Sequence, residues 1–159
     1  MADRIAVMDQ GRILQTAPPE ELYEAPNSRM VADFIGTMNL FPARVLGTAS
    51  PGIRLEVAGI GEFEVPATAP PGAEVGVAVR PEKVQISREP PAPGLIAARG
   101  SVAQVAYFGD YSHVAVNVGA DVRVTCYHTH RSRRDRGGFV EGEACWVSWD
   151  PADCILLIE

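Results

Sequence analysis

The chain has 159 residues, of which 47% are hydrophobic and 21% charged, and a formal net charge of −6 at pH 7. These values are typical of a globular domain large enough to bury a core. The negative charge argues against a general nucleic-acid binder, which is usually basic. No apolar run approaches the roughly eighteen residues that a membrane-spanning helix needs.

The cysteine pattern gives no sign of a disulfide framework or a metal site. Cys126, Cys145 and Cys154 are odd in number, and none of them forms a CxxC pair. Each lies in a strand-like run beside Val, Trp or Ile, where a free cysteine behaves as a small hydrophobe. We therefore expect free thiols and a reducing compartment.

The first seventeen residues predict a β-hairpin. An apolar strand, Ile5 to Met8, is followed by a turn that contains Gly11, and a second strand runs from Arg12 to Thr16. Two short apolar runs separated by a glycine-containing turn are a hairpin signal.

Two short helices are expected next. Pro18-Pro19 suit the first turn of a helix, which Pro26 ends. Asn27 or Ser28 can cap the second helix, and Gly36 ends it. Its apolar face is predicted from helical spacing to consist of Met30, Val31, Phe34 and Ile35.

From residue 41 onward the apolar pattern changes from helical to strand-like. Alternating apolar residues predict strands at 53–57, 63–65, 75–79, 84–86, 95–108, 114–118, 122–126, 145–149 and 155–158. The proline-rich run 89–94 cannot join a central sheet, so we expect it to connect two halves of one β domain that covers residues 40–159. Seven or more short strands with almost no helix predict a small Greek-key barrel.

The N-terminal stretch resembles a known family. Its matching residues, in order and without gaps, are Ala2 to Met8, Gly11, Ile13, Gln15, Pro19-Glu20-Glu21, Tyr23, Pro26, Val31-Ala32, Phe34-Ile35-Gly36 and Asn39. In this pattern the stretch resembles the last segment of the ATP-binding subunit of bacterial ABC importers. Pro18 departs from it, because the family usually carries a helix-capping threonine there. The resemblance implies that residues 1–39 are the tail of a nucleotide-binding domain.

The β segment resembles the transport-associated oligonucleotide/oligosaccharide-binding (TOBE) domain of polyamine, iron and sugar importers. The residues that carry this resemblance are Val79-Arg80-Pro81-Glu82, Tyr107-Phe108-Gly109-Asp110 and Trp149-Asp150-Pro151-Ala152-Asp153. It implies a mainly β fold, an OB-like Greek-key β-barrel preceded by the hairpin and the two helices. It also implies a regulatory and dimerisation role in the importer ATPase.

ATP hydrolysis is not expected of this chain. It contains no GxxxxGK[ST] phosphate-binding loop, no LSGGQ-like signature and no apolar strand that ends in paired acids. The resemblance therefore implies a non-catalytic part of an ABC transporter ATPase, with ATP and Mg²⁺ bound only by the longer parent. It also implies a homodimer, permease and substrate-binding partners, and a cytoplasmic location on the inner face of the membrane. No cofactor or metal is expected in the chain itself.

Two other functions remain open at this stage. One is a small-ligand barrel that senses an oxyanion or the transported substrate. The other is an oligonucleotide binder, which would need interleaved basic and aromatic residues. Because aromatic residues are 7% of the chain and its net charge is negative, this last alternative is the least favoured.

Six residues are candidates for a regulatory or interface role. Arg80 and Glu82 end a strand, where they could bind an anion, although pairing of Arg80 with a carboxylate at a barrel corner is the favoured interpretation. Trp146 and Trp149 are an odd number of residues apart, so they should face opposite sides of their strand. One is expected in the core and the other near a dimer contact, with Tyr107 or Tyr111 as neighbours.

Two further patterns are weaker. His128 and His130 lie on one side of an extended segment and could bind a metal, but a solvated strand end is favoured because no third ligand is evident. The arginines of 131–138 could meet phosphate or an acidic partner, but a solvated loop is favoured. No pattern indicates a nucleophile with its base, so no catalytic residue is assigned.

Overall fold

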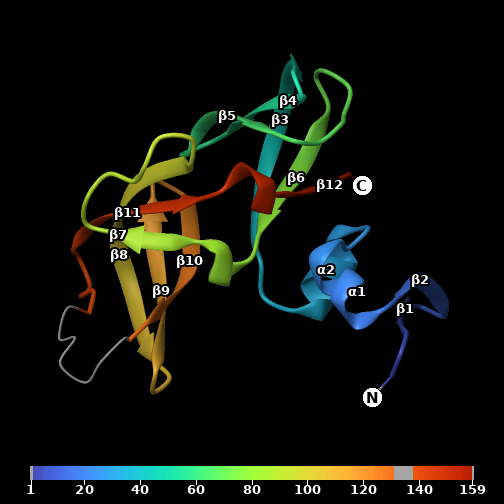
Figure 1. The fold of residues 1–159 in the computed structure, drawn as a ribbon, viewed down its shortest axis with the longest axis horizontal. Helices are drawn as coiled ribbons and strands as arrows, with labels where there is room; N and C mark the ends of the chain where they lie inside the picture. The colour runs from blue at the N-terminus through green and yellow to red at the C-terminus, as the bar shows by residue number, and fades with distance from the viewer. Residues whose placement is uncertain (1, 131–137, 159) are drawn as a thin grey trace.

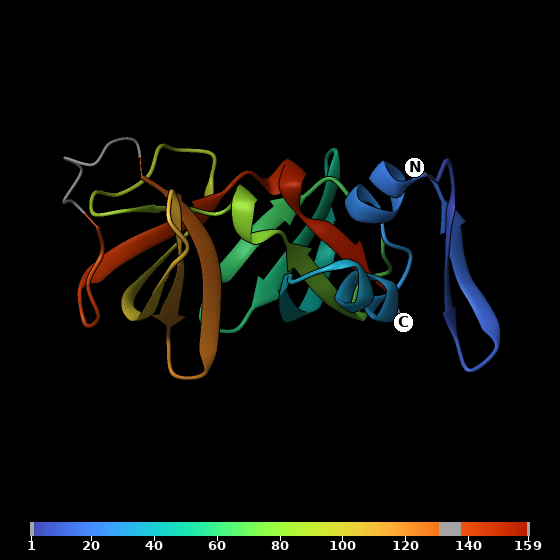
Figure 2. The same cartoon turned by 90° about the horizontal axis from the view of Figure 1, so that it is seen from below.

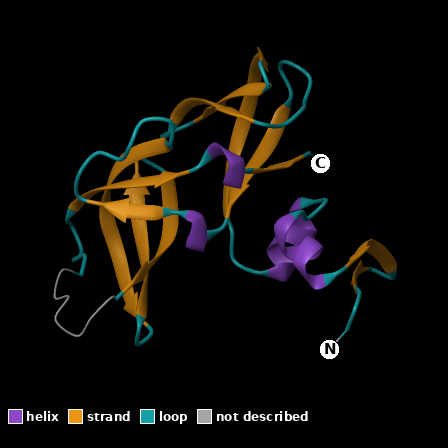
Figure 3. Cartoon of the chain, in the orientation of Figure 1, coloured by secondary structure: helices purple, strands orange, loops and turns teal. Residues whose placement is uncertain are grey.

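The computed structural model describes residues 2–130 and 138–158 (Figure 1). Most of these residues lie in strands, as Figure 3 shows. The strands are β1 (Ile5–Asp9), β2 (Arg12–Ala17), β3 (Asn39–Ala49), β4 (Gly52–Val57), β5 (Gly61–Val65), β6 (Glu74–Val79), β7 (Gln85–Ser87), β8 (Ile96–Tyr107), β9 (Tyr111–Val118), β10 (Val122–Thr129), β11 (Ala144–Trp149) and β12 (Ile155–Leu157). The helices are α1 (Pro19–Glu24) and α2 (Arg29–Ile35), and the 3₁₀ turns are η1 (Pro81–Lys83) and η2 (Pro151–Asp153).

Two five-stranded antiparallel sheets form the barrel. Their strand orders are β12-β6-β3-β4-β5 and β10-β9-β8-β11-β7. Along most strands buried residues alternate with exposed ones, so each sheet turns one apolar face inward. The inward faces of both sheets meet in a single hydrophobic cluster, which includes Phe41, Leu55, Val77, Val116 and Trp149. The sequence prediction of a mainly β, OB-like barrel is confirmed.

The chain crosses between the sheets twice by the same device. After β6 the turn η1 leads into β7, which pairs with β11 of the other sheet. After β11 the turn η2 leads back to β12, which pairs with β6. Both turns begin with a proline, and β6 and β11 have the same alternation of buried and exposed residues. The segments before and after the 89–94 connector therefore contribute strands to each other's sheets.

One central strand was not predicted. β3 pairs with both β4 and β6, yet the sequence analysis assigned no strand to 39–49. Its buried residues Phe41, Ala43 and Val45 do alternate with exposed ones. Pro42 and Gly47 lie within the same run, and both are usually unfavourable inside a strand, which obscured the alternation.

The N-terminal hairpin forms as predicted from β1 and β2. Gln10 and Gly11 both have positive φ, at 45° and 78°, as a tight hairpin turn with two left-handed residues requires. Figure 2 shows that the hairpin stands at one end of the molecule, beyond the two helices. Its buried residues Val7 and Ala17 pack in a small cluster with helical side chains, Leu22 and Val31.

Helix α2 begins and ends where the sequence indicates. The Ser28 hydroxyl accepts a hydrogen bond from the Val31 N–H at 3.3 Å, and Gly36 is the C-cap. The predicted apolar face is wrong in part, because Met30 and Phe34 are 51% and 72% exposed. α2 instead buries Val31 toward the hairpin and Ala32 toward the β6–β12 edge. Within the described ranges, no helix is long and apolar enough to span a membrane.

Candidate functional site

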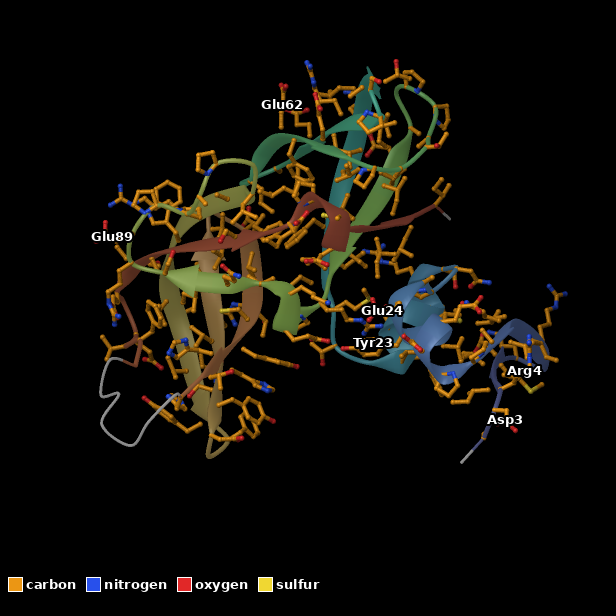
Figure 4. The ribbon with its side chains drawn as sticks, viewed as in Figure 1. Asp3, Arg4, Tyr23, Glu24, Glu62 and Glu89 are labelled. Carbon is orange, nitrogen blue, oxygen red and sulfur yellow. The ribbon has the colours of Figure 1, made fainter. Side chains whose placement is uncertain are left out.

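Arg80 connects the barrel to helix α1. Its side chain is only 4% exposed, and its Nη2 atom donates a hydrogen bond to the Tyr23 carbonyl oxygen at 2.6 Å. The guanidinium carbon also lies 3.8 Å from the centre of the Tyr23 ring, a cation–π contact. Figure 4 labels Tyr23 and Glu24 on α1.

The expected carboxylate partner of Arg80 is therefore wrong, since its direct contacts are a main-chain carbonyl and an aromatic ring. Burial lowers the pKa of Arg80, and the carboxylate of Glu24 acts in the opposite direction. The residue fixes the position of α1 and is not presented to an external anion.

Glu82, two residues later, borders an open cavity of about 420 Å³. This cavity lies between η1 and the end of the β9–β10 hairpin nearest Asp110. Its lining consists of Glu82, Asp110, Tyr111, His113, Tyr127 and Thr129. We call these six residues the β9–β10 cavity.

Strand register explains why this lining converges. Tyr127 pairs with His113, and Thr129 pairs with Tyr111, across the β9–β10 ladder. Residues 112, 114 and 116 point into the core, so their neighbours Tyr111 and His113 lie on the opposite, outer face of the sheet. The four paired side chains therefore cover one continuous patch outside the core.

The aromatic rings of this patch are in mutual contact. The His113 and Tyr127 rings are stacked with centroids 4.2 Å apart, and the Tyr111 ring lies 5.4 Å from His113 and 5.9 Å from Tyr127. Phe108 adds a further ring, 4.3 Å from His113. Burial raises the pKa of Tyr127, and the nearby carboxylate of Glu82 raises it further. The rings therefore form a preorganised wall that faces a negative charge.

The two predicted tryptophan positions differ in burial. Trp149 is 1% exposed and packs on Phe41, with ring centroids 6.0 Å apart, so it belongs to the core. Trp146 is half-buried, on the opposite side of β11. Of the pair, only Trp146 has exposed surface to offer a partner.

Tyr107 is not a neighbour of Trp146, contrary to expectation. Trp146 pairs with Arg99 on β8, whereas Tyr107 lies eight residues further along that strand. At the usual rise of a β-strand these two β8 positions are about 26 Å apart. Tyr107 is 69% exposed and its ring lies 6.2 Å from that of His130. Trp146 and the tyrosines therefore belong to different surfaces.

The histidine pair lies beside the β9–β10 cavity. The rings of His128 and His130 are 5.6 Å apart and perpendicular, and the Nε2 atom of His130 is hydrogen-bonded to the Ser112 hydroxyl at 2.7 Å. His128 contacts Phe139 edge-on. Among the described residues no group of three or more potential metal ligands is found. The arginine-rich loop predicted at 131–138 lies outside them except for its last residue.

The thiols are not chemically activated. Cys126, Cys145 and Cys154 are free, as predicted. Burial raises the pKa of Cys126 to about 12 and that of Cys154 to about 11. Since the thiolate is the nucleophilic form, these groups act as parts of the core and not as reactive cysteines.

Sequence reasoning identified Glu82 and Tyr111 but missed Asp110, His113 and Tyr127. The alternation of β9 and β10 would have placed His113 and Tyr127 outside the core. Their pairing, however, depends on the hairpin register, which sets which residues face each other. The position of η1 over this hairpin depends on tertiary contacts.

Comparisons with known proteins agree with this architecture. The family model of the TOBE domain matches residues 77–157, and the chain belongs to that family. The solved structure of the cytoplasmic molybdate-binding protein ModG has a similar fold, with a TM-score of 0.66 and 13% sequence identity over 76% of this chain and 96% of that one.

Curated relatives match almost the whole chain. The putrescine transport ATP-binding protein PotG of Escherichia coli is 35% identical over 99% of this chain and 42% of its own length. The spermidine/putrescine import ATP-binding protein PotA of Frankia alni is 38% identical over 100% of this chain and 36% of its own length. The chain thus spans less than half the length of these relatives. It corresponds to their C-terminal, non-catalytic region and not to the ATPase domain.

Proposed function

We propose that this chain is the regulatory and dimerisation part of the ATP-binding subunit of an ABC importer. The observation that carries the proposal is the match of nearly the whole chain to the C-terminal region of such subunits, together with the TOBE family assignment. In a parent subunit, ATP and Mg²⁺ would bind to the separate nucleotide-binding domain. Permease subunits and a substrate-binding protein would be its partners, at the cytoplasmic face of the membrane.

Dimerisation through the barrel is the testable core of this proposal. Most soluble homo-oligomers are two-fold dimers that use the same patch on both copies, and interface cores are rich in aromatic residues. The chain offers two separate candidates, the half-buried Trp146 and the exposed pair Tyr107 and Phe108. Both surfaces lie outside the core that holds Trp149.

Sedimentation velocity of the whole chain at tens of micromolar protein tests the proposal. We expect a dimer, and a single monomeric species would contradict it. Trp146→Ala and Tyr107→Ala then compare the two surfaces, and the variant in the interface should weaken the dimer by about 2 kcal/mol or more. A dimer unaffected by both variants would exclude both residues while leaving the dimer itself intact.

A small-ligand sensing barrel is the second candidate function. The specific observation that favours it is the open β9–β10 cavity, whose volume falls within the range typical of small-molecule sites. The fold likeness to a molybdate-binding protein shows only that such a barrel exists in a ligand-binding protein. We propose no nucleic-acid partner, because the net charge of −6 opposes contact with phosphates.

A further inference from the structure

The β9–β10 cavity has the composition of a cation site. Two carboxylates border it from different elements, Glu82 from η1 and Asp110 from the turn between β8 and β9. Between them stand the rings of Tyr111, His113 and Tyr127. Aromatic faces attract cations through the negative potential of the ring, and carboxylates supply the opposite full charge.

The nearest buried cation does not neutralise these acids. Arg80 lowers the pKa of Tyr127, so its charge is felt near the cavity, although more weakly than that of Glu82. Its guanidinium is directed to the carbonyl and ring of Tyr23 on α1, and it is not among the residues that line the cavity. The charges at the cavity rim are therefore predominantly negative.

This arrangement discriminates between ligand classes. An oxyanion would have to approach two carboxylates, and among the six lining residues there is no lysine or arginine to hold it. A bare divalent metal ion would not use the aromatic rings, since hard cations take oxygen ligands. An organic ammonium group uses both features, because its charge pairs with a carboxylate while its methylene groups lie on the rings.

We propose that the β9–β10 cavity binds a small organic ammonium cation, with Glu82 as the main charge partner and Tyr127 as the aromatic wall. A diamine suits the cavity because Asp110 offers a second carboxylate from another element. This inference does not depend on dimerisation or on attachment to an ATPase domain. It can therefore fail while the proposed function stands, and the reverse is also true.

Isothermal titration of the whole chain with 1,4-diaminobutane tests the inference. The titration is done at pH 8, above the range in which histidine side chains ordinarily titrate. We expect saturable binding of one diamine per chain. Neutral 1,4-butanediol and molybdate, titrated in the same buffer, should give no saturable binding.

Matched variants locate the site. Glu82→Gln should weaken diamine binding about tenfold, because it removes a charged partner. Tyr127→Leu, which keeps an apolar side chain but removes the ring, should weaken it about threefold. Glu62→Gln is the control, since Glu62 lies on β5 of the other sheet (Figure 4) and the variant changes the net charge equally.

Three outcomes would overturn the inference. They are the absence of saturable diamine binding, equal weakening by Glu82→Gln and Glu62→Gln, and binding of butanediol or molybdate as tight as that of the diamine. Equal weakening in particular would mean that the diamine responds to the net charge of the chain and not to this cavity.

Discussion

Arg80 and Tyr23 join parts of the chain that are 57 residues apart in sequence. The sequence predicted that Arg80 ends a strand at a turn, which is correct. Its partner could not be predicted, because a carbonyl oxygen on a helix carries no side-chain signal. The same reason limits the β9–β10 cavity, whose members are recognisable singly but are assembled by register and by the position of η1.

Replacement of Arg80 should loosen α1 without unfolding the barrel. Arg80→Met keeps the apolar stem but removes the hydrogen bond to the Tyr23 carbonyl and the cation–π contact, so docking of α1 should weaken by about 1–3 kcal/mol. Hydrogen exchange at the amides of 19–24 should become faster, while the amides of β8 and β9 keep their protection.

Arg44→Met provides the matched control for this measurement. Arg44 forms an exposed ion pair with Glu74 at 4.0 Å, and such pairs contribute about 0–1 kcal/mol. If both variants changed the exchange of α1 equally, or if Arg80→Met left it unchanged, Arg80 would not be the link between the two parts.

At the level of strands and helices, alternation of apolar residues predicted most of the barrel correctly. It succeeded for β9 and β11 because each has one face in the core and no proline or glycine to interrupt the pattern. It failed for β3, where Pro42 breaks the pattern but is tolerated. It also failed for the exposed face of α2, since a short helix between two partners buries a different set of side chains.

Gly100 in β8 illustrates a constraint between strands. A Cβ atom at this position would collide with the carbonyl oxygen of Asn117 and with the Val116 side chain on β9. Gly100→Ala should therefore destabilise the barrel by about 1–3 kcal/mol, as overpacking in a core usually does. Urea unfolding followed by tryptophan fluorescence measures the free energy of unfolding.

Gly47→Ala in β3 is the control, because a Cβ there meets no atom within 4 Å and the backbone has no positive φ. That variant should change the free energy of unfolding by less than about 1 kcal/mol. Equal destabilisation by the two variants would show that loss of glycine itself, and not the approach of β9, causes the effect.

For the molecule as a whole, the exchanged strands β7 and β12 make the two sheets interdependent. A cut between residues 91 and 92 would leave β7 on one fragment and its partner β11 on the other, and likewise β6 and β12. We expect fragments 1–91 and 92–159 each to show poorly dispersed NMR spectra alone. A mixture of the two should recover the spectrum of the intact chain.

A folded spectrum from either fragment alone would contradict this expectation, because that fragment would then form its sheet without the strand from the other. Failure of the mixture to recover the native spectrum, with both fragments unfolded, would show that the 89–94 connector is needed for assembly. The first result concerns the shared core, and the second concerns only the covalent link.

The position of β12 also sets an order of events during synthesis. β6 is made about eighty residues before the strand that pairs with its outer edge, and contacts so distant in sequence are slow to form. Until Ile155–Leu157 leave the ribosome, that edge of β6 is open to other unpaired strands. On a ribosome, then, this barrel is a late folder, and its most aggregation-prone interval ends only when β12 emerges.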